Sequence, residues 1–115
     1  PRGRKNCVDM GCCTRAEMNV PQGQRYELCR SVHAEANAII SAARRDMVGG
    51  TLYLAGKDAS TGRLLHDTSS CSMCRRLIIN AGLAKVIART GPGTYTVTEV
   101  REWIEDDDTL PARTN

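Results

Sequence analysis

The sequence is poor in aromatic residues: its 115 residues include no phenylalanine, one tryptophan and three tyrosines. Proteins that bind single-stranded nucleic acid stack the bases on aromatic side chains, so this scarcity argues against a polynucleotide partner. The formal net charge of +3 is also too small to indicate one. No apolar run is long enough to form a transmembrane helix or the core of a signal peptide. We therefore expect neither a membrane partner nor secretion.

The six cysteines allow two interpretations. A disulfide framework is typical of small secreted domains, but no leader is visible, so we expect the reducing cytoplasm, where cysteines more often bind metals or take part in chemistry. The 115 residues and the hydrophobic content of 41% fit a single domain over residues 1–115. Because large aromatic side chains are scarce, its core is thin, and a metal that links two helices would help to stabilise it.

Two short motifs carry the chemistry of the chain. One residue separates His33 from Glu35, and Cys71 and Cys74 form a C-x-x-C motif. An imidazole and two thiolates are three good zinc ligands, and three protein ligands leave the fourth tetrahedral position to water, as in catalytic zinc sites. Taken singly, a histidine at a helix start is more often a cap or a buried polar group, and a C-x-x-C motif is as often redox-active or structural. Together, the two motifs favour a catalytic zinc site.

Both motifs are predicted to lie at helix starts. The alanine-rich run at residues 34–45 predicts a helix that stops before Gly49-Gly50. Serines 69 and 70 predict the cap of a second helix, which contains Cys74 and ends at Gly82. The spacing of three puts both sulfurs on one face of this helix. Because the positive end of a helix dipole favours thiolate over thiol, we expect two helix starts that converge on one metal to keep the cysteines deprotonated.

The pattern between and after the motifs predicts an α/β fold. Residues 51–55 and 84–88 are expected to form short strands, and each follows one of the zinc helices. Such an α-β-α-β run favours strands that lie side by side in one sheet with helices on its faces. Residues 56–63 have the composition of a turn, and Leu64–His66 are expected to form a further short strand.

The last predicted element is a helix near the C-terminus. The sequence Thr-Val-Thr-Glu at residues 96–99 matches a capping box, which marks a helix start. The apolar stripe behind it has helical spacing and is most simply a core face. It consists of Val97, Val100, Trp103 and Ile104.

The sequence around both motifs resembles the cytidine and deoxycytidylate deaminase superfamily over residues 1–88. The matching segments are V-H-A-E-A-N-A-I at residues 32–39, G-T-L-Y-L at 50–54, C-S-M-C at 71–74 and I-N-A-G-L at 79–83. The deoxycytidylate (dCMP) deaminase branch is most similar, since its cysteine helix typically runs into an I-N-A-G-I sequence. The resemblance implies a mixed β-sheet flanked by helices, in the three-layer α-β-α arrangement of the cytidine deaminases. The pairing of H-x-E with C-x-x-C is typical of zinc-dependent nucleobase deaminases.

Carried over by motif, the resemblance implies that His33, Cys71 and Cys74 hold Zn²⁺ and that Glu35 is the catalytic residue. Glu35 would take a proton from zinc-bound water and deliver protons to the ring nitrogen and to the leaving ammonia. The implied reaction converts a cytosine nucleotide to the uracil nucleotide, with dCMP to dUMP as the leading assignment. Two alternatives stay open: deamination of adenosine or cytidine in RNA, and a non-catalytic structural zinc module. Glu35 argues against the second, because a structural zinc has no use for a carboxylate beside an open position.

The resemblance extends to the N-terminal residues. Pro1-Arg2-Gly3 resembles the end of the N-G-x-P-x-G nucleotide loop of the dCMP deaminase branch, so Arg2, Gly3 and Arg4 are candidates for binding a substrate phosphate. Cys7 lies near the position of a cysteine that holds a second, structural zinc in some dCMP deaminases. The simpler interpretation is that Cys7 and the cysteines at positions 12, 13 and 29 are four buried or surface thiols.

The chain departs from the family pattern at two places. The proline that usually precedes the first cysteine is Ser70 here, and because serine is a good helix cap we expect a modest loss of rigidity rather than an inactive site. The chain also begins where the family has already completed its first helix and a two-stranded hairpin, so we expect both to be missing from it. The expected partners are a small nucleotide and further copies of this chain in a homo-oligomer.

Overall fold

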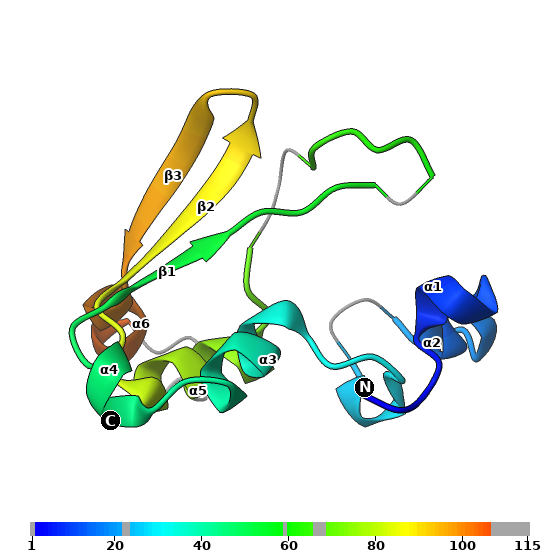
Figure 1. Ribbon diagram of the computed structural model, residues 1–115, viewed down its shortest axis with the longest axis horizontal. Helices are drawn as coiled ribbons and strands as arrows, with labels where there is room; N and C mark the ends of the chain where they lie inside the picture. The colour runs from blue at the N-terminus through cyan, green and yellow to red at the C-terminus, as the bar shows by residue number, and fades with distance from the viewer. Residues whose placement is uncertain (1, 22–23, 59, 66–68, 107–115) are drawn as a thin grey trace, which may run out of the picture.

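The computed structural model describes residues 2–21, 24–58, 60–65 and 69–106 of the chain. In chain order its elements are α1 (Cys7–Met10), α2 (Thr14–Glu17), the 3₁₀ helix η1 (Tyr26–Leu28), α3 (Ala34–Ile40), α4 (Arg44–Met47), β1 (Thr51–Leu54), α5 (Ser72–Ala81), β2 (Lys85–Gly91), β3 (Thr94–Glu99) and α6 (Val100–Glu105). Figure 1 shows α1 and α2 apart from the sheet, with α3 and α5 side by side between them.

The strands form one mixed sheet in the order β1-β2-β3. β1 and β2 run parallel, with Leu52 paired with Val86, whereas β2 and β3 run antiparallel, with Ile87 paired with Val97. In the tight turn between β2 and β3, Gly93 has a φ of +83°, a conformation that glycine adopts without strain. The chain passes through α3, β1, α5 and β2 in that order. The predicted α/β class and the mixed sheet are therefore confirmed.

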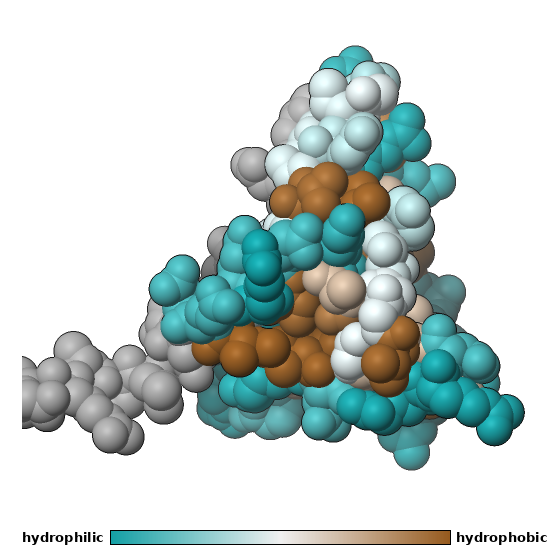
Figure 2. Space-filling view, turned by 90° about the vertical axis from the view of Figure 1, so that its left-hand side faces the viewer, coloured by the Kyte–Doolittle hydropathy of each residue, from teal (hydrophilic) through white to brown (hydrophobic). Residues whose placement is uncertain are grey.

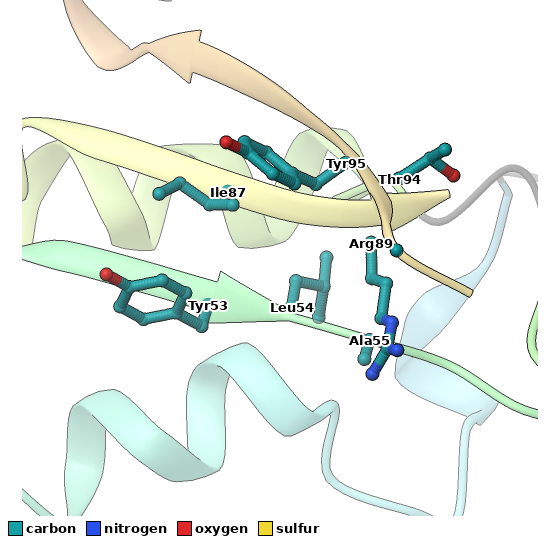
Figure 3. A pocket seen from close by; sticks show the side chains of 8 residues that line it. Tyr53, Leu54, Ala55, Ile87, Arg89, Thr94 and Tyr95 are labelled. Carbon is teal, nitrogen blue, oxygen red and sulfur yellow. The ribbon is translucent and has the colours of Figure 1, made fainter. Parts of the chain in front are cut away.

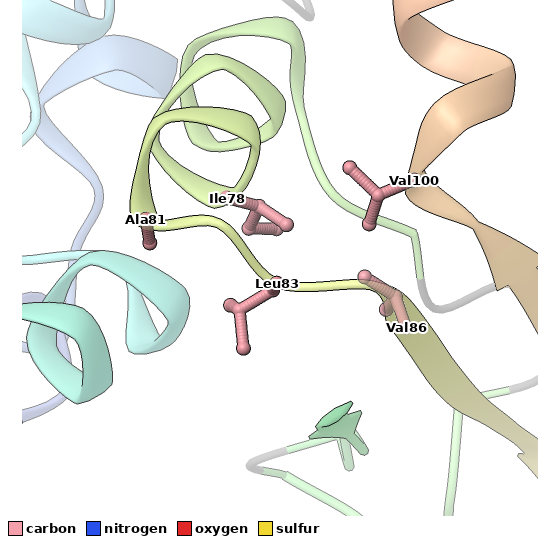
Figure 4. Packing of buried hydrophobic residues seen from close by; sticks show 5 residues of the cluster. All are labelled: Ile78, Ala81, Leu83, Val86 and Val100. Carbon is pink, nitrogen blue, oxygen red and sulfur yellow. The ribbon is translucent and has the colours of Figure 1, made fainter. Parts of the chain in front are cut away.

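The hydrophobic core lies between one face of the sheet and α5. Along β2, Val86 and Ala88 are buried and alternate with side chains on the other face, as the pleat of a strand requires. α3 and α6 pack Ile39 and Trp103 against the same cluster, so the helices cover the same face of the sheet. Figure 4 shows the five buried residues of this cluster, which are Ile78, Ala81, Leu83, Val86 and Val100.

The opposite face of the sheet is uncovered in the described part of the chain. Tyr53 is 75% exposed and Tyr95 is 64% exposed, and both lie on this face with Ile87 (Figure 3). A cavity of about 640 Å³ lies here. Its lining consists of Tyr53, Leu54, Ala55, Ile87, Arg89, Gly93, Thr94 and Tyr95. Of the expected three layers, the sheet and one helical layer are thus present among the described elements.

The helix predicted over residues 34–45 is interrupted. α3 ends at Ile40, and α4 begins only at Arg44. The hydroxyl of Ser41 donates to the carbonyl oxygen of Asn37 at 2.8 Å, and serine side chains that bond to the backbone in this way compete with helix propagation. Ala43 is extended, with a ψ of +139°. The helix therefore ends before Ser41 although the segment is rich in alanine.

The capping box predicted at residues 96–99 is wrong. These residues lie in β3, and α6 begins at Val100. Threonine, valine and tyrosine favour strands. Residues 96–99 also pair with β2 along their whole length, so strand pairing outweighs the local preference for a helix start. Val97 is 50% exposed on the sheet and Ile104 is 59% exposed, whereas Val100 and Trp103 pack in or against the core as predicted.

The predicted turn after β1 is present. Asp58 Oδ1 accepts hydrogen bonds from the backbone N–H groups of Ser60 and Thr61 at 2.8 and 3.3 Å. Bonds from the Ser60 hydroxyl and from these backbone groups lower the pKa of Asp58. Leu64, predicted to lie in a strand, forms only an isolated bridge with Lys57, and His66 lies outside the described residues.

Some apolar surface is exposed away from the sheet face. Figure 2 views the side on which α4 and α6 lie in Figure 1, and apolar atoms gather there between hydrophilic side chains. Ile104 on α6 and Val48 after α4 are both more than half exposed. None of the helices in the described ranges is long and apolar enough to cross a membrane.

Candidate metal centre

The candidate metal centre lies where the starts of α3 and α5 meet. His33 is the N-cap of α3, Cys71 is the N-cap of α5, and Cys74 lies in the first turn of α5. α3 and α5 pack against each other, which brings the imidazole to the two thiols across 38 and 41 residues of sequence. α5 ends as predicted at Gly82, in the left-handed conformation.

The three ligand atoms have the spacing of a tetrahedral zinc site. His33 Nδ1 lies 3.6 Å from Cys71 Sγ and 3.4 Å from Cys74 Sγ. With Zn–S bonds of about 2.3 Å and a Zn–N bond of about 2.0 Å, tetrahedral zinc separates nitrogen and sulfur ligands by about 3.5 Å. The donor set therefore fits zinc, with Nδ1 as the ligand atom of His33. Within the described ranges, no other three His, Cys, Asp or Glu side chains come together in this way.

Glu35 is buried beside these ligands without being one of them. It lies in the first turn of α3 and is only 9% exposed. Its charge and a side-chain hydrogen bond act on Cys74, so the two side chains are close. No ion pair with a lysine or arginine of the described residues neutralises Glu35. A carboxylate in this position is available to accept and release protons at the open ligand position.

Cys74 is the most deeply buried side chain of the metal centre. The residue is fully buried, and burial, followed by the charge of Glu35, raises the pKa of its thiol to about 12. Desolvation opposes the charged form of this thiol, and the expectation that helix starts converging on a metal keep the cysteines deprotonated stays a prediction. The thiol gives up its proton when the metal binds.

Cys71 caps α5, in place of the serines predicted to do so. Its Sγ accepts a hydrogen bond from the backbone N–H of Cys74 at 3.5 Å. Ser70 is 6% exposed, and its hydroxyl has no hydrogen-bond partner among the described residues. The Ser70 carbonyl accepts a bond from Arg75 Nε at 3.0 Å, and the Arg75 guanidinium lies 5.1 Å from the ring centroid of Trp103. Arg75 thus ties the segment before Cys71 to α6.

Sequence reasoning missed the aromatic contact to His33. The ring of Tyr26 meets the imidazole edge to face, with 5.2 Å between centroids and an interplanar angle of 90°. The Arg15 guanidinium lies over the Tyr26 ring, 4.4 Å from its centroid. It also donates hydrogen bonds to the carbonyl oxygens of Gln24 and Pro21. Such partners fix the orientation of a metal ligand. The only signal in the sequence was a tyrosine seven residues before the histidine, which has no diagnostic value.

The predicted phosphate residues differ in their relation to a polar cavity. Arg2 lines a polar cavity beside α3, whereas Gly3 and Arg4 do not. Gly3 has a φ of +78°, a conformation that glycine adopts without strain. Of the three candidates, Arg2 is the one that lines this cavity.

The cysteines outside the metal centre do not assemble into a second site. Cys7 donates its backbone N–H to Ser31 Oγ at 3.3 Å, and a side-chain hydrogen bond with Ser31 lowers the pKa of the Cys7 thiol. The structure does not bring Cys7 together with two further metal-binding side chains of the described residues. Cys7 and the three cysteines at positions 12, 13 and 29 are free thiols. A second metal at Cys7 stays a prediction from the sequence.

Comparison with known proteins shows which family has a sequence similar to the region around this centre. The family model described as "Cytidine and deoxycytidylate deaminase zinc-binding region" matches residues 4–90. Over 90 residues, which are 78% of this chain and 24% of the relative, the chain is 31% identical to deoxycytidylate deaminase of Schizosaccharomyces pombe. Over 91 residues, 76% of this chain and 60% of the relative, it is 31% identical to deoxycytidylate deaminase of Mycobacterium phage D29. No solved structure matches the chain.

These matches confirm the cofactor. The matched region is a zinc-binding region, and it contains the three side chains whose atoms have zinc-ligand spacing. Zinc is therefore the metal of this centre. The chain spans about a quarter of one relative and about three fifths of the other.

Proposed function

This chain belongs to the cytidine and deoxycytidylate deaminase family, and we propose that it is a zinc-dependent hydrolase that converts dCMP to dUMP and ammonia. The buried carboxylate of Glu35, next to three ligands that leave one zinc position open, carries this proposal. Both relatives are named deoxycytidylate deaminases, which supports dCMP as the substrate.

Each residue of the centre has a role in the proposed reaction. His33, Cys71 and Cys74 hold the zinc, which when bound lowers the pKa of water enough to supply a nucleophile near neutral pH. The Glu35 carboxylate accepts a proton from the water that attacks the amino-bearing carbon, and returns it to the neighbouring ring nitrogen. Glu35 then moves the second proton to the amino group, so the C–N bond breaks and ammonia leaves. Water is the only co-reactant.

The position of Glu35 distinguishes this proposal from a structural zinc module. The carboxylate lies two residues from a ligand on the same helix start, so the backbone fixes it relative to the metal. Burial of a carboxylate that forms no ion pair costs free energy. A site that served only for stability would gain nothing from this arrangement, whereas a deaminase requires it.

A free nucleotide fits the site better than RNA does. Tyr53 and Tyr95 lie on the uncovered sheet face rather than at the metal centre. The ring of Tyr26 is occupied by His33 and Arg15, and that of Trp103 is covered by Arg75. No aromatic side chain of the described residues is left at the centre to stack the bases of a polynucleotide.

Three further assignments stay predictions from the sequence. They are a single domain over residues 1–115, a homo-oligomeric state and a cytoplasmic location.

The zinc-loaded protein with Glu35→Gln tests the proposed role of Glu35. Glutamine has the shape of glutamate but cannot carry the proton, so we expect about one zinc per chain and a kcat for dCMP lower by roughly two to four powers of ten. Elemental analysis gives the zinc content, and an ammonia assay gives the rate. The control Cys74→Ser is expected to lose zinc and to melt at a lower temperature, because the metal links two helices.

Each arm can contradict part of the proposal. A Glu35→Gln protein that deaminates dCMP at nearly the parent rate would remove Glu35 from the mechanism. Unchanged zinc in Cys74→Ser would remove Cys74 from the ligand set. A zinc-loaded parent protein that releases no ammonia from cytosine nucleotides or nucleosides would overturn the deaminase function itself.

A further inference from the structure

The backbone on both sides of Cys71 is held by hydrogen bonds from a single residue. The backbone N–H of Arg75 donates to the Cys71 carbonyl oxygen at 2.9 Å, as the first turn of an α-helix requires. Nε of the same arginine donates to the Ser70 carbonyl oxygen at 3.0 Å. The two carbonyls belong to the planar peptide units that precede and follow Cys71. Because both units are restrained, the direction of the Cys71 side chain relative to α5 is restrained as well.

The Arg75 side chain is anchored in turn by α6. Its guanidinium lies 5.1 Å from the ring centroid of Trp103, and the face of an indole ring attracts a cation. Trp103 packs against the buried cluster, and α5 and α6 contact each other. Arg75 forms no ion pair with a carboxylate of the described residues. The position of the guanidinium therefore depends on Trp103 rather than on a counter-ion.

The Ser70 side chain does not share in this support. Ser70 is buried, and its hydroxyl has no hydrogen-bond partner among the described residues. A buried hydroxyl that lacks a partner costs free energy, so this side chain does not hold the segment before Cys71 in place. The bond from Arg75 to the Ser70 carbonyl oxygen supplies a restraint that the serine itself does not.

We propose that Arg75 and Trp103 are positioning residues of the metal centre. Arg75 holds Cys71 in the orientation that suits zinc, and Trp103 holds Arg75; neither is a ligand. Trp103 lies beyond residues 4–90, over which the family model matches, so part of the support comes from outside the matched zinc-binding region. The inference concerns how tightly zinc is held and is independent of the substrate.

Zinc affinity, measured by competition with a chelator, tests the role of Arg75. Arg75→Met keeps an aliphatic stem and the backbone bond to Cys71 but removes the Nε donor. We expect the Kd for zinc to rise roughly ten- to hundredfold, as is typical when a group that orients a metal ligand is lost. Arg76→Met is the matched control, because Arg76 is the exposed neighbour on the same helix, and it is expected to bind zinc like the parent.

Two substitutions of Trp103 test the second step. Trp103→Phe keeps an aromatic face for the guanidinium, whereas Trp103→Leu removes it. We expect the Kd for zinc to rise more in Trp103→Leu than in Trp103→Phe. Equal zinc affinity in these two variants would remove Trp103 from the proposal.

A rescue experiment separates the orientation of Cys71 from general stability. Proline fixes its own φ and keeps the carbonyl oxygen, so Ser70→Pro restrains the residue before Cys71 through the covalent chain. In the Arg75→Met background we expect it to restore most of the zinc affinity, and in the parent to change it little. Where Arg75→Met does not fold, Arg75→Lys replaces it, since lysine keeps the cation but lacks the planar Nε donor, and a weaker hold on zinc is again expected.

Three outcomes decide the matter. Zinc affinity like that of the parent in Arg75→Met, or equal losses in Arg75→Met and Arg76→Met, would overturn the proposal. A loss that Ser70→Pro does not reduce would also overturn it, because Arg75 would then act on the packing of α5 against α6 rather than on Cys71. Variants that bind zinc as expected, in a chain whose parent releases no ammonia, would support this inference and count against the proposed function alone.

Discussion

The N-terminal region, residues 2–32, and the sheet region, residues 51–106, are held together in different ways. The sheet region contains the buried cluster around Ile78 and Val86. In the N-terminal region, no described residue is buried, and its helices α1, α2 and η1 are three or four residues long. Helices this short are not stable alone. Apolar burial stabilises the sheet region, whereas the N-terminal region depends on polar contacts.

Those polar contacts can be named. Arg30 Nε donates to the Lys5 carbonyl oxygen at 2.7 Å, and the Cys7 backbone N–H donates to Ser31 Oγ. Each neutral bond of this kind contributes only about 1 kcal/mol net. The metal centre joins α3, which directly follows the N-terminal region, to α5 of the sheet region. The comparison teaches that the two regions differ in the kind of interaction that holds them, apolar burial in one and hydrogen bonds in the other.

Matched truncations in the two regions give the largest expected contrast. Ile78→Ala removes a fully buried side chain, and we expect a loss of about 2–5 kcal/mol in the free energy of unfolding. Val8→Ala in α1, where Val8 is 76% exposed, is expected to change it by less than about 0.5 kcal/mol. Urea unfolding followed by circular dichroism measures both. Similar losses in the two variants would mean that the N-terminal region is packed after all.

The junction between the regions should respond to pH through Cys74. The thiol has its pKa raised to about 12 in the absence of metal, so the proton must leave when the thiolate binds zinc. The apparent Kd for zinc should then rise about tenfold for each unit by which the pH falls, between about pH 8.5 and 6.5, from this proton alone. Competition with a chelator of known affinity measures it. A Kd that is independent of pH in this range would show that Cys74 is already a thiolate.

The smallest expected effect concerns the contact by which the N-terminal region orients His33. Tyr26→Leu removes the ring that meets the imidazole edge to face, a contact worth about 0.5–1.5 kcal/mol. We expect zinc affinity to fall between about two- and tenfold, while Tyr26→Phe, which keeps the ring, stays close to the parent. Titration of both variants with zinc provides the comparison. Unchanged affinity in Tyr26→Leu would mean that His33 is oriented without the N-terminal region.

Local patterns were sufficient where one short segment carries the information. The His33–Glu35 spacing, the C-x-x-C motif and the Gly82 stop each depend on a few adjacent residues, and the structure places all of them at helix ends. The strands at residues 51–54 and 85–91 were predicted in type, although β2 extends three residues beyond its expected end. Such segments combine periodicity with turn signals, which are visible without a partner.

Local patterns failed where a distant partner decided the outcome. Residues 96–99 have the sequence of a helix start, but they pair with β2 through backbone hydrogen bonds and therefore form a strand. Cys71 rather than a serine caps α5, because the helix begins at Ser72 and the Cys71 sulfur accepts the backbone N–H of Cys74. No local pattern indicated that burial beside Glu35 raises the pKa of Cys74.

By itself the sequence determined the metal, the chemistry of its ligands and the class of fold, because donor types at fixed spacing and the order of helices and strands are local properties. Only the tertiary structure decided that His33 Nδ1 meets two sulfurs from across the chain, that Tyr26 and Arg15 support that imidazole, and that Arg2 rather than Arg4 borders a cavity beside α3. These facts depend on distances between segments far apart in sequence. Packing sets such distances, and no short window of residues encodes them.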